Sequence, residues 1–354
     1  GGGSLRQTGV WRHFSPKADM SRKNSLSQFP PATENRTRNF LSDCFANIEK
    51  LPFLATRTSP SKRTENLPAM TNSPVINESE IVAYYDNCQI DYAMLWHLNS
   101  QLCMHYGYWE PGVRRLRQAL NLMNQKVAEC ARITASDVVL DAGCGVGGSS
   151  IFLAKNYSCR AHGITLSQKQ VESCRQNAAA HGVSHLVQFD RQNYLATDFP
   201  DQSFDVVWAI ESSCYAFDKR DFLAEAYRLL RPGGRLVVAD FFTVPMAEGS
   251  EDAKLMQRWT DTWAIKSYAV TEEFEAGAKA EGFENVVVRD VTQNVLPSIR
   301  RLYFYFYPGL IATKFCQLFG IRNRLQTANT WSTYYQFKAW KKGLWKYNII
   351  SAER

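Results

Sequence analysis

A short segment at residues 138–148 combines an acidic side chain with closely spaced glycines, which is a pattern of ligand-binding turns. An apolar run ends at Asp141, and Gly143, Gly145 and Gly147 follow. Glycines in such a turn let the backbone approach a ligand closely before a helix begins. A carboxylate two residues before the first glycine is poorly placed for a pyrophosphate, but it suits an amino group. The segment therefore favours a ligand with an amino group over a dinucleotide.

A second acidic residue follows a later apolar run. Residues 204–209 are typical of a buried strand, and Ile210, Glu211 and Tyr215 come after it. Loops at the carboxyl ends of parallel strands form the ligand crevice of an α/β sheet. A glutamate is costly to bury there unless it is paired, so Glu211 is a candidate catalytic base. The alternative is that Glu211 only anchors a ligand or a loop.

Alternating strand and helix patterns predict the scaffold that positions these residues. Strands are expected at 138–141, 160–166, 186–189, 204–209 and 236–241, and helices at 148–156, 168–181 and 219–230. This alternation is typical of a parallel sheet covered on both faces. Upstream, residues 78–99 and 114–131 are expected to be helical. Downstream we expect a helix at 271–281 and strands at 285–291 and 344–352.

Four segments resemble, in order and spacing, the motifs of class I S-adenosylmethionine (SAM)-dependent methyltransferases of the type 11 group. They are the glycine turn and residues 163–170, 199–208 and 229–236. The G-I-T-L-S and E-S-x-x-Y forms are similar to the sterol, tocopherol and cyclopropane-fatty-acid-synthase branch. The resemblance implies an α/β, Rossmann-like fold with a seven-stranded, mostly parallel sheet and helices on both faces. It also implies an N-terminal helical cap and a C-terminal aromatic lid. The alternative is an unrelated nucleotide-binding sheet.

The resemblance implies SAM as the cofactor, with Gly143, Gly145 and Gly147 along its methionine portion. Most class I enzymes hold the ribose with an acid after the second strand, whereas Thr165, Leu166 and Gln170 are implied for that contact here. Asn193 stands where many relatives have Asp, and it can pair with the adenine through its carbonyl oxygen or be a simple loop residue. The full set of implied cofactor residues, with no metal ligand among them, is Tyr106, Gly107, Asp141, Gly143, Gly145, Gly147, Thr165, Leu166, Gln170, Asn193 and Ile210.

The aromatic segment 105–109 resembles the element that folds over the methionine end of SAM in the same branch. It implies that Tyr106 and Gly107 contact the cofactor and that His105 lines the pocket. Aromatic faces stabilise a sulfonium or a carbocation by about 0.5–2 kcal/mol each. The alternative is that these aromatic residues belong to the core. The candidate catalytic residues are Glu211, Tyr215 and His105.

A second aromatic segment, 302–311, lies between Arg300–Arg301 and Lys314. The uncharged run is too short to span a bilayer. We interpret it first as a lid over an apolar acceptor pocket and second as a core element. The third interpretation is peripheral membrane contact through residues 300–321, using the flanking cations.

Charge and cysteine content narrow the function classes. Of the 41 Lys and Arg and 34 Asp and Glu, residues 1–69 contain 11 and 5, and residues 70–354 contain 30 and 29. The basicity therefore belongs to the N-terminal part, and we expect no nucleic-acid partner. The nine cysteines include no C-x-x-C pair. An odd number without that spacing favours a reducing, intracellular compartment over a zinc site or a disulfide framework.

Residues 1–75 are expected to be a disordered tail. Their Arg- and Ser-rich, acid-poor composition is typical of an organellar transit peptide, and a solvated tail is the alternative. The expected location is thus the plastid or mitochondrion if the tail is a transit peptide, and otherwise the cytoplasm. Residues 76–354 are expected to form the methyltransferase domain, with 76–131 as the helical cap and 297–335 as a lid-like insertion.

The predicted activity is methyl transfer from SAM to a small apolar or amphipathic acceptor. Carbon methylation of an isoprenoid-type molecule (sterol, tocopherol precursor or prenyl chain) is the first interpretation. Nitrogen or oxygen methylation of a small metabolite comes next, and cyclopropane synthesis on acyl chains third. A non-catalytic SAM-binding sensor is a further alternative, and the oligomeric state stays open.

Overall fold

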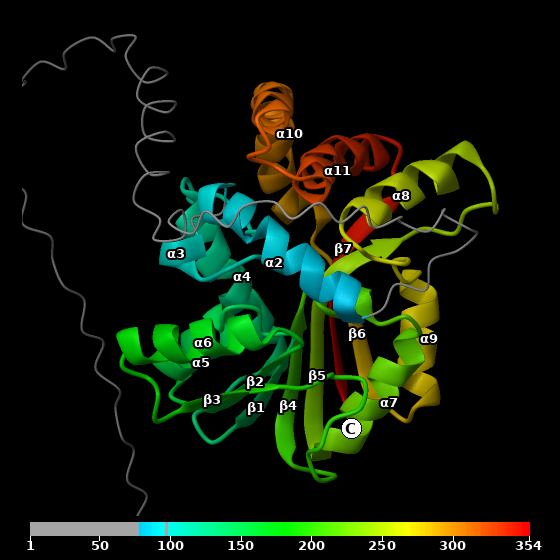
Figure 1. Cartoon of the computed structure of the whole chain (residues 1–354). Helices are drawn as coiled ribbons and strands as arrows, with labels where there is room; N and C mark the ends of the chain where they lie inside the picture. Colours follow the sequence, from blue (N-terminus) through cyan, green and yellow to red (C-terminus); the bar gives the residue numbers. More distant parts are fainter. Residues whose placement is uncertain (1–77, 96–97) are drawn as a thin grey trace, which may run out of the picture. The chain divides into compact units, whose positions relative to one another are not determined.

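The computed structural model describes residues 78–95 and 98–354, and these form a seven-stranded sheet flanked by helices (Figure 1). The expected disordered tail and transit peptide at 1–75 lie outside the described residues. The strands are β1 (Val138–Ala142), β2 (Arg160–Thr165), β3 (Val187–Arg191), β4 (Phe204–Ile210), β5 (Leu230–Thr243), β6 (Glu284–Asp290) and β7 (Trp345–Glu353).

The sheet order is β3-β2-β1-β4-β5-β7-β6. Strands β1 to β5 pair in parallel, and β7 runs antiparallel between β5 and β6. The prediction of a mostly parallel seven-stranded sheet is confirmed. The carboxyl ends of the five parallel strands therefore meet at one edge, where ligands of such sheets bind.

Helices cover both faces of the sheet. They are α2 (Glu78–Leu95), α3 (Leu98–Gln101), α4 (Leu116–Ala131), α5 (Gly148–Tyr157), α6 (Gln168–Ala180), α7 (Lys219–Leu229), α8 (Glu251–Thr262), α9 (Thr271–Ala280), α10 (Thr292–Leu318) and α11 (Arg324–Lys341), with a 3-10 turn η1 (Ser213–Tyr215). In Figure 1, α2, α10 and α11 lie over the end of the sheet where the parallel strands finish, at the top of the view.

Strand periodicity divides the core into two layers. Val139, Val206 and Val237 belong to one buried cluster, which also holds side chains of α4, α8, α10 and α11. Their neighbours Leu140 and Val207 belong to a second cluster with α7 and α9. Successive side chains of a strand point to opposite faces, so apolar runs of this kind require helices on both sides.

The structure differs from the expectations mainly at the C-terminal end. The aromatic segment is part of one 27-residue helix, α10, which contains Pro297 and Pro308. Helix α8 is not anticipated, and the helix expected at 78–99 ends at Leu95. Helix α10 has apolar side chains on both its buried and exposed faces, so it lacks the one-sided period that marks an amphipathic helix. The lid role of 297–335 stays a prediction.

Candidate functional site

The predicted site residues gather where three neighbouring strands end. In the sheet register, Asp141 of β1 lies beside Gly163 of β2 and Trp208 of β4. Thr165 ends β2, and Glu211 directly follows β4. Residues that are far apart in the sequence are therefore placed at one edge of the sheet.

The glycine turn after β1 has a backbone that other residues rarely adopt. The φ angles of Gly143, Gly145 and Gly147 are +92°, +55° and +87°, a region where an L side chain is strained. A Cβ atom on Gly143 would lie 2.5 Å from the Cβ of Ser212, and one on Gly145 would overlap the end of Met104. The three glycines, called the glycine cradle below, thus leave bare backbone at the end of β1, packed against Ser212 and Met104. Their contact with the methionine portion of SAM stays a prediction.

Asp141 lies at the floor of this cradle and is buried. Its Oδ2 accepts hydrogen bonds from the Ser150 N–H (3.1 Å) and the Ser150 hydroxyl (2.6 Å). Burial raises the pKa of Asp141 to about 6, against the effect of those two bonds. Oδ1 has no hydrogen-bond partner among the described residues. It can therefore accept from an amino group, and an ammonium there would favour the ionised carboxylate.

The predicted ribose contacts meet at the end of β2. The Thr165 hydroxyl donates to Gln170 Oε1 at 2.5 Å, and the Ser167 side chain caps the first turn of α6. The carbonyl oxygen of Asn193 accepts from the Leu195 N–H (2.9 Å), and its amide donates to Glu78 (2.7 Å). Asn193 thus stabilises a turn here, and its adenine contact stays a prediction.

Glu211 is fixed in an unusual conformation. Its φ of +50° is left-handed, which is rare for a residue with a side chain. Its N–H still donates to the Ala239 carbonyl at 2.8 Å. Its Oε1 accepts from the Tyr106 N–H at 2.7 Å and from the Tyr347 hydroxyl at 2.8 Å. Two donors from distant segments of the chain therefore hold Oε1 in place.

The surroundings of Glu211 favour its protonated form. Burial raises its pKa to about 8, although the bonds from Tyr106 and Tyr347 act in the opposite direction and Asp240 adds to the rise. Burial also raises the pKa of Tyr347 well above its ordinary value, so its hydroxyl remains a donor. A glutamate whose pKa lies near the working pH is suited to exchange a proton.

The aromatic segment 105–109, which precedes α4, is more buried than the sequence indicates. His105 is buried, with Nδ1 bonded to the Tyr106 carbonyl (2.9 Å) and Nε2 facing the Asn124 amide (3.1 Å). Burial lowers the pKa of His105 to about 4, which keeps the ring neutral. A Cβ on Gly107 would lie 2.6 Å from the Cβ of Ala119, so this glycine lets the segment pack on α4. The catalytic role of His105 and the cofactor contact of Gly107 stay predictions.

Two site residues are absent from the sequence-based set. Tyr347, on β7, donates to Glu211, and Gln336, on α11, accepts from the Tyr106 hydroxyl at 2.8 Å. Tyr215, which was anticipated, accepts from the hydroxyl of Tyr85 on α2 at 3.1 Å. The sequence carries no motif around Tyr347 or Gln336, because their contacts depend on the pairing of β7 with β5 and on the docking of α11.

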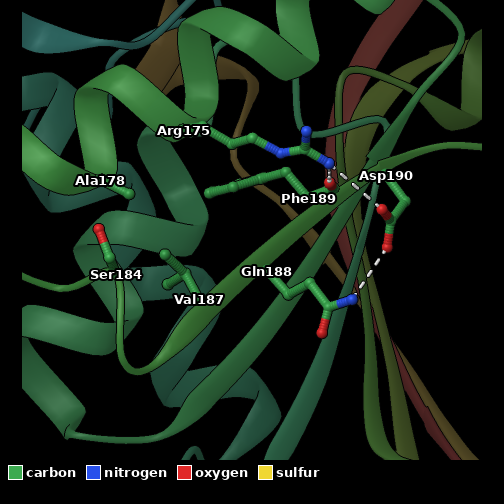
Figure 2. A pocket seen from close by; sticks show the side chains of 7 residues that line it. All are labelled: Arg175, Ala178, Ser184, Val187, Gln188, Phe189 and Asp190. Atoms are coloured by element: carbon green, nitrogen blue, oxygen red, sulfur yellow. Dashed lines mark hydrogen bonds and ion pairs between the residues drawn. The ribbon is translucent and has the colours of Figure 1, made fainter.

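A hollow of about 230 Å³ lies elsewhere, between α6 and the edge strand β3. Figure 2 shows Arg175 bonded to the Phe189 carbonyl and paired with Asp190. The lining residues are Arg175, Ala178, Ser184, Val187, Gln188, Phe189 and Asp190. None of the predicted site residues lines it, so this hollow does not belong to the site at the strand ends.

Comparison with known proteins agrees with this geometry. Residues 140–238 match the family described as a methyltransferase domain. The 27-O-demethylrifamycin SV methyltransferase of Amycolatopsis mediterranei (strain S699) is 34% identical over 205 residues, covering 58% of this chain and 73% of that protein. The chloroplastic tocopherol O-methyltransferase of Arabidopsis thaliana is 24% identical over 275 residues, covering 71% and 76%. A solved geranyl diphosphate methyltransferase with its substrate and sinefungin has a TM-score of 0.62 at 22% identity, covering 78% and 98%.

The fold, the glycine cradle and these relatives define a SAM-binding transferase. The chain belongs to the class I SAM-dependent methyltransferases, in the branch that its motifs indicate. It is a methyltransferase enzyme and uses SAM as its cofactor.

Proposed function

We propose that this enzyme methylates an apolar, isoprenoid-bearing acceptor held beside Glu211. The observation that carries the proposal is the double hydrogen bond to Oε1 from the Tyr106 N–H and the Tyr347 hydroxyl. No described residue donates to Oε2. That oxygen is therefore the atom left to face an acceptor.

The chemistry follows from this geometry. SAM supplies, when bound, a methyl group on a positively charged sulfur. Asp141 and the glycine cradle would hold the amino-acid end. As the acceptor atom bonds to the methyl carbon, the carbon–sulfur bond breaks, the sulfur leaves as a neutral thioether, and Glu211 accepts the proton that the acceptor atom loses. Tyr347 and the Tyr106 N–H stabilise the ionised carboxylate of Glu211. Without these donors, burial would raise the pKa of Glu211 further and leave less of the side chain ionised.

Aromatic side chains around Glu211 support an apolar acceptor. Phe241 of β5 has six ring neighbours with centroids 4.8 to 6.2 Å away, namely Tyr106, Trp259, Trp263, Tyr268, Trp345 and Tyr347. Two of these, Tyr106 and Tyr347, also donate to Glu211. Most of these rings are buried in the core, so the protein next to Glu211 is aromatic and apolar on this side, which supports an apolar acceptor.

The relatives favour isoprenoid acceptors but differ in the atom that is methylated. Tocopherol is the named substrate of the Arabidopsis enzyme, and geranyl diphosphate that of the solved methyltransferase. Carbon methylation is our first choice. Oxygen methylation is the second candidate, because the Arabidopsis relative is named as an O-methyltransferase. A plastid location fits the chloroplastic relative and the composition of residues 1–75.

An acceptor panel tests the proposal. The purified full chain would be incubated with methyl-labelled SAM and, separately, with geranyl diphosphate, a prenylated hydroquinone, tocopherol or a small polar amine. We expect label in the solvent-extractable product of at least one isoprenoid and none in the amine. The position of the label in the product, determined by mass spectrometry, distinguishes carbon methylation from oxygen methylation. Transfer to the amine alone would contradict the proposal.

A further inference from the structure

One face of α10 exposes a continuous row of large apolar side chains. The row, called the α10 stripe below, consists of Phe304, Tyr307, Ile311, Phe315 and Leu318, which are between 57% and 83% exposed. Their spacing of three and four residues places them on one side of the helix. A row of this length on a solvent-exposed face is a candidate interaction site.

The opposite face of α10 already packs against the protein. Leu302, Phe306 and Thr313 are buried, and Phe306 contacts the rings of Trp331 and Tyr334 on α11. The helix is therefore anchored, and the α10 stripe is not a core surface. The apolar surface continues past the helix end with exposed side chains at Phe319, Ile321 and Leu325.

The charge of this region has one sign. Residues 292–341 contain seven Lys and Arg and no Asp or Glu, whereas the remainder of 70–354 contains 23 basic and 29 acidic residues. Arg322 is neutralised by Asp91. Lys314 lies between Ile311 and Leu318, next to the stripe by helical spacing. Arg300 lies one turn before Phe304, with its guanidinium 5.5 Å from the centre of the Trp340 ring on α11.

We propose that the α10 stripe docks on the surface of an anionic lipid bilayer. Apolar side chains enter the interfacial layer while neighbouring Lys and Arg contact the lipid headgroups. A second copy of the chain fits less well, because two such faces would bring like charges together. No helix in the described ranges is long and apolar enough to cross a bilayer, so the contact is peripheral, with α10 lying along the surface.

Vesicle co-sedimentation with the full chain tests this surface. Phosphatidylcholine vesicles would be compared with vesicles that also contain phosphatidylglycerol, at low and high salt. We expect binding to the anionic vesicles that salt weakens. The combined substitutions Phe304→Ser, Ile311→Ser and Leu318→Ser should reduce the partition coefficient by ~100-fold or more. Lys314→Glu should weaken binding and reduce its salt dependence.

Matched controls separate docking from folding. Val287→Ser replaces an exposed apolar residue on β6, and Lys155→Glu reverses an exposed charge on α5. Both should bind vesicles as the wild type does, and the triple variant should keep its SAM affinity. The proposal is overturned if the wild type ignores anionic vesicles or if the triple variant binds them equally well. It is also overturned if the triple substitution dissociates a dimer that does not bind vesicles, since the stripe would then join two copies.

Discussion

At the scale of single residues, Glu211 combines three uncommon features. Its backbone is left-handed, its pKa is raised by burial to about 8, and its carboxylate depends on donors from two distant segments. A strained, half-buried acid persists only where the surrounding structure determines it. Such a combination at a strand end is characteristic of a functional residue, which is why we assign the proton transfer to it.

Glu211→Gln should change stability in a pH-dependent way. The pKa of Glu211 is about 8 in the folded protein against an ordinary 4.5, so the folded state keeps a proton that the unfolded chain has released between these values. The bound proton of Glu211 therefore contributes to the stability of the wild type below pH 4.5, and this contribution is lost as the pH rises to about 8. The difference in Tm, variant minus wild type, should be near zero below pH 4.5 and grow up to pH 8. A difference that is independent of pH would contradict the raised pKa.

Tyr347→Phe should shift the pH dependence of methyl transfer. The lost hydrogen bond stabilises the ionised form of Glu211, so the apparent pKa should rise by about 1 unit and the rate at neutral pH fall by about tenfold. SAM affinity should not change. Tyr157→Phe, on α5 away from the site, is the matched control. An unshifted pH profile would show that Tyr347 does not position Glu211.

Sequence position identifies only some of these residues. Asp141 and Glu211 are predictable because each follows an apolar strand that ends at a ligand-binding edge. Tyr347 is not predictable, since its hydrogen bond to Glu211 joins residues that are 136 positions apart. The roles of His105 and Asn193 depend on hydrogen bonds with Asn124 and Glu78, which no sequence motif reports.

At the scale of elements, β1 carries carboxylate contacts at both of its ends. Asp141 lies at the carboxyl end, where it bonds to Ser150 on α5. At the other end, the Val138 N–H donates to Asp205 at 2.8 Å, and Asp205 also pairs with Arg231. Ligands of parallel sheets bind at the carboxyl ends, so only Asp141 should matter for the cofactor.

The two ends of β1 therefore give a matched pair of substitutions. Asp141→Asn should weaken SAM binding by about tenfold or more, because a charged acceptor for the amino group is lost. Asp205→Asn should lower the Tm without changing SAM affinity. Titration calorimetry measures the SAM affinity of both variants, and thermal unfolding measures their Tm. Equal affinities for Asp141→Asn and the wild type would contradict the assignment of the cradle.

Elements are predictable where their pattern is local. The strands and helices from β1 to β4 and helix α7 lie within two residues of their expected bounds, because glycines and apolar runs mark them, whereas β5 begins at Leu230, six residues before its expected start. Helices α10 and α11 are less predictable. In α10, Leu302 and Phe306 face the core while Phe304 and Tyr307 face outward, so burial cannot be read from apolarity alone.

At the scale of the whole molecule, charge is separated along the described chain. The basic surplus of 70–354 lies in residues 292–341, which contain α10 and α11, and the other residues have more acids than bases. Helix α11 also contributes Gln336 to the site through Tyr106. The helical pair that carries the proposed membrane contact is thus linked to the site by one hydrogen bond, an arrangement that suits an acceptor dissolved in lipid.

Single-turnover methyl transfer by the Glu211→Gln variant tests whether Glu211 accepts the proton from the acceptor. The wild type and the variant would each be loaded with methyl-labelled SAM and mixed with the best isoprenoid of the acceptor panel, with Glu273→Gln, an exposed change on α9, as the control. We predict that Glu211→Gln binds SAM as tightly as the wild type but transfers the label at least ~100-fold more slowly. The control variant should match the wild type in both. Transfer by Glu211→Gln at the wild-type rate would show that Glu211 is not the base.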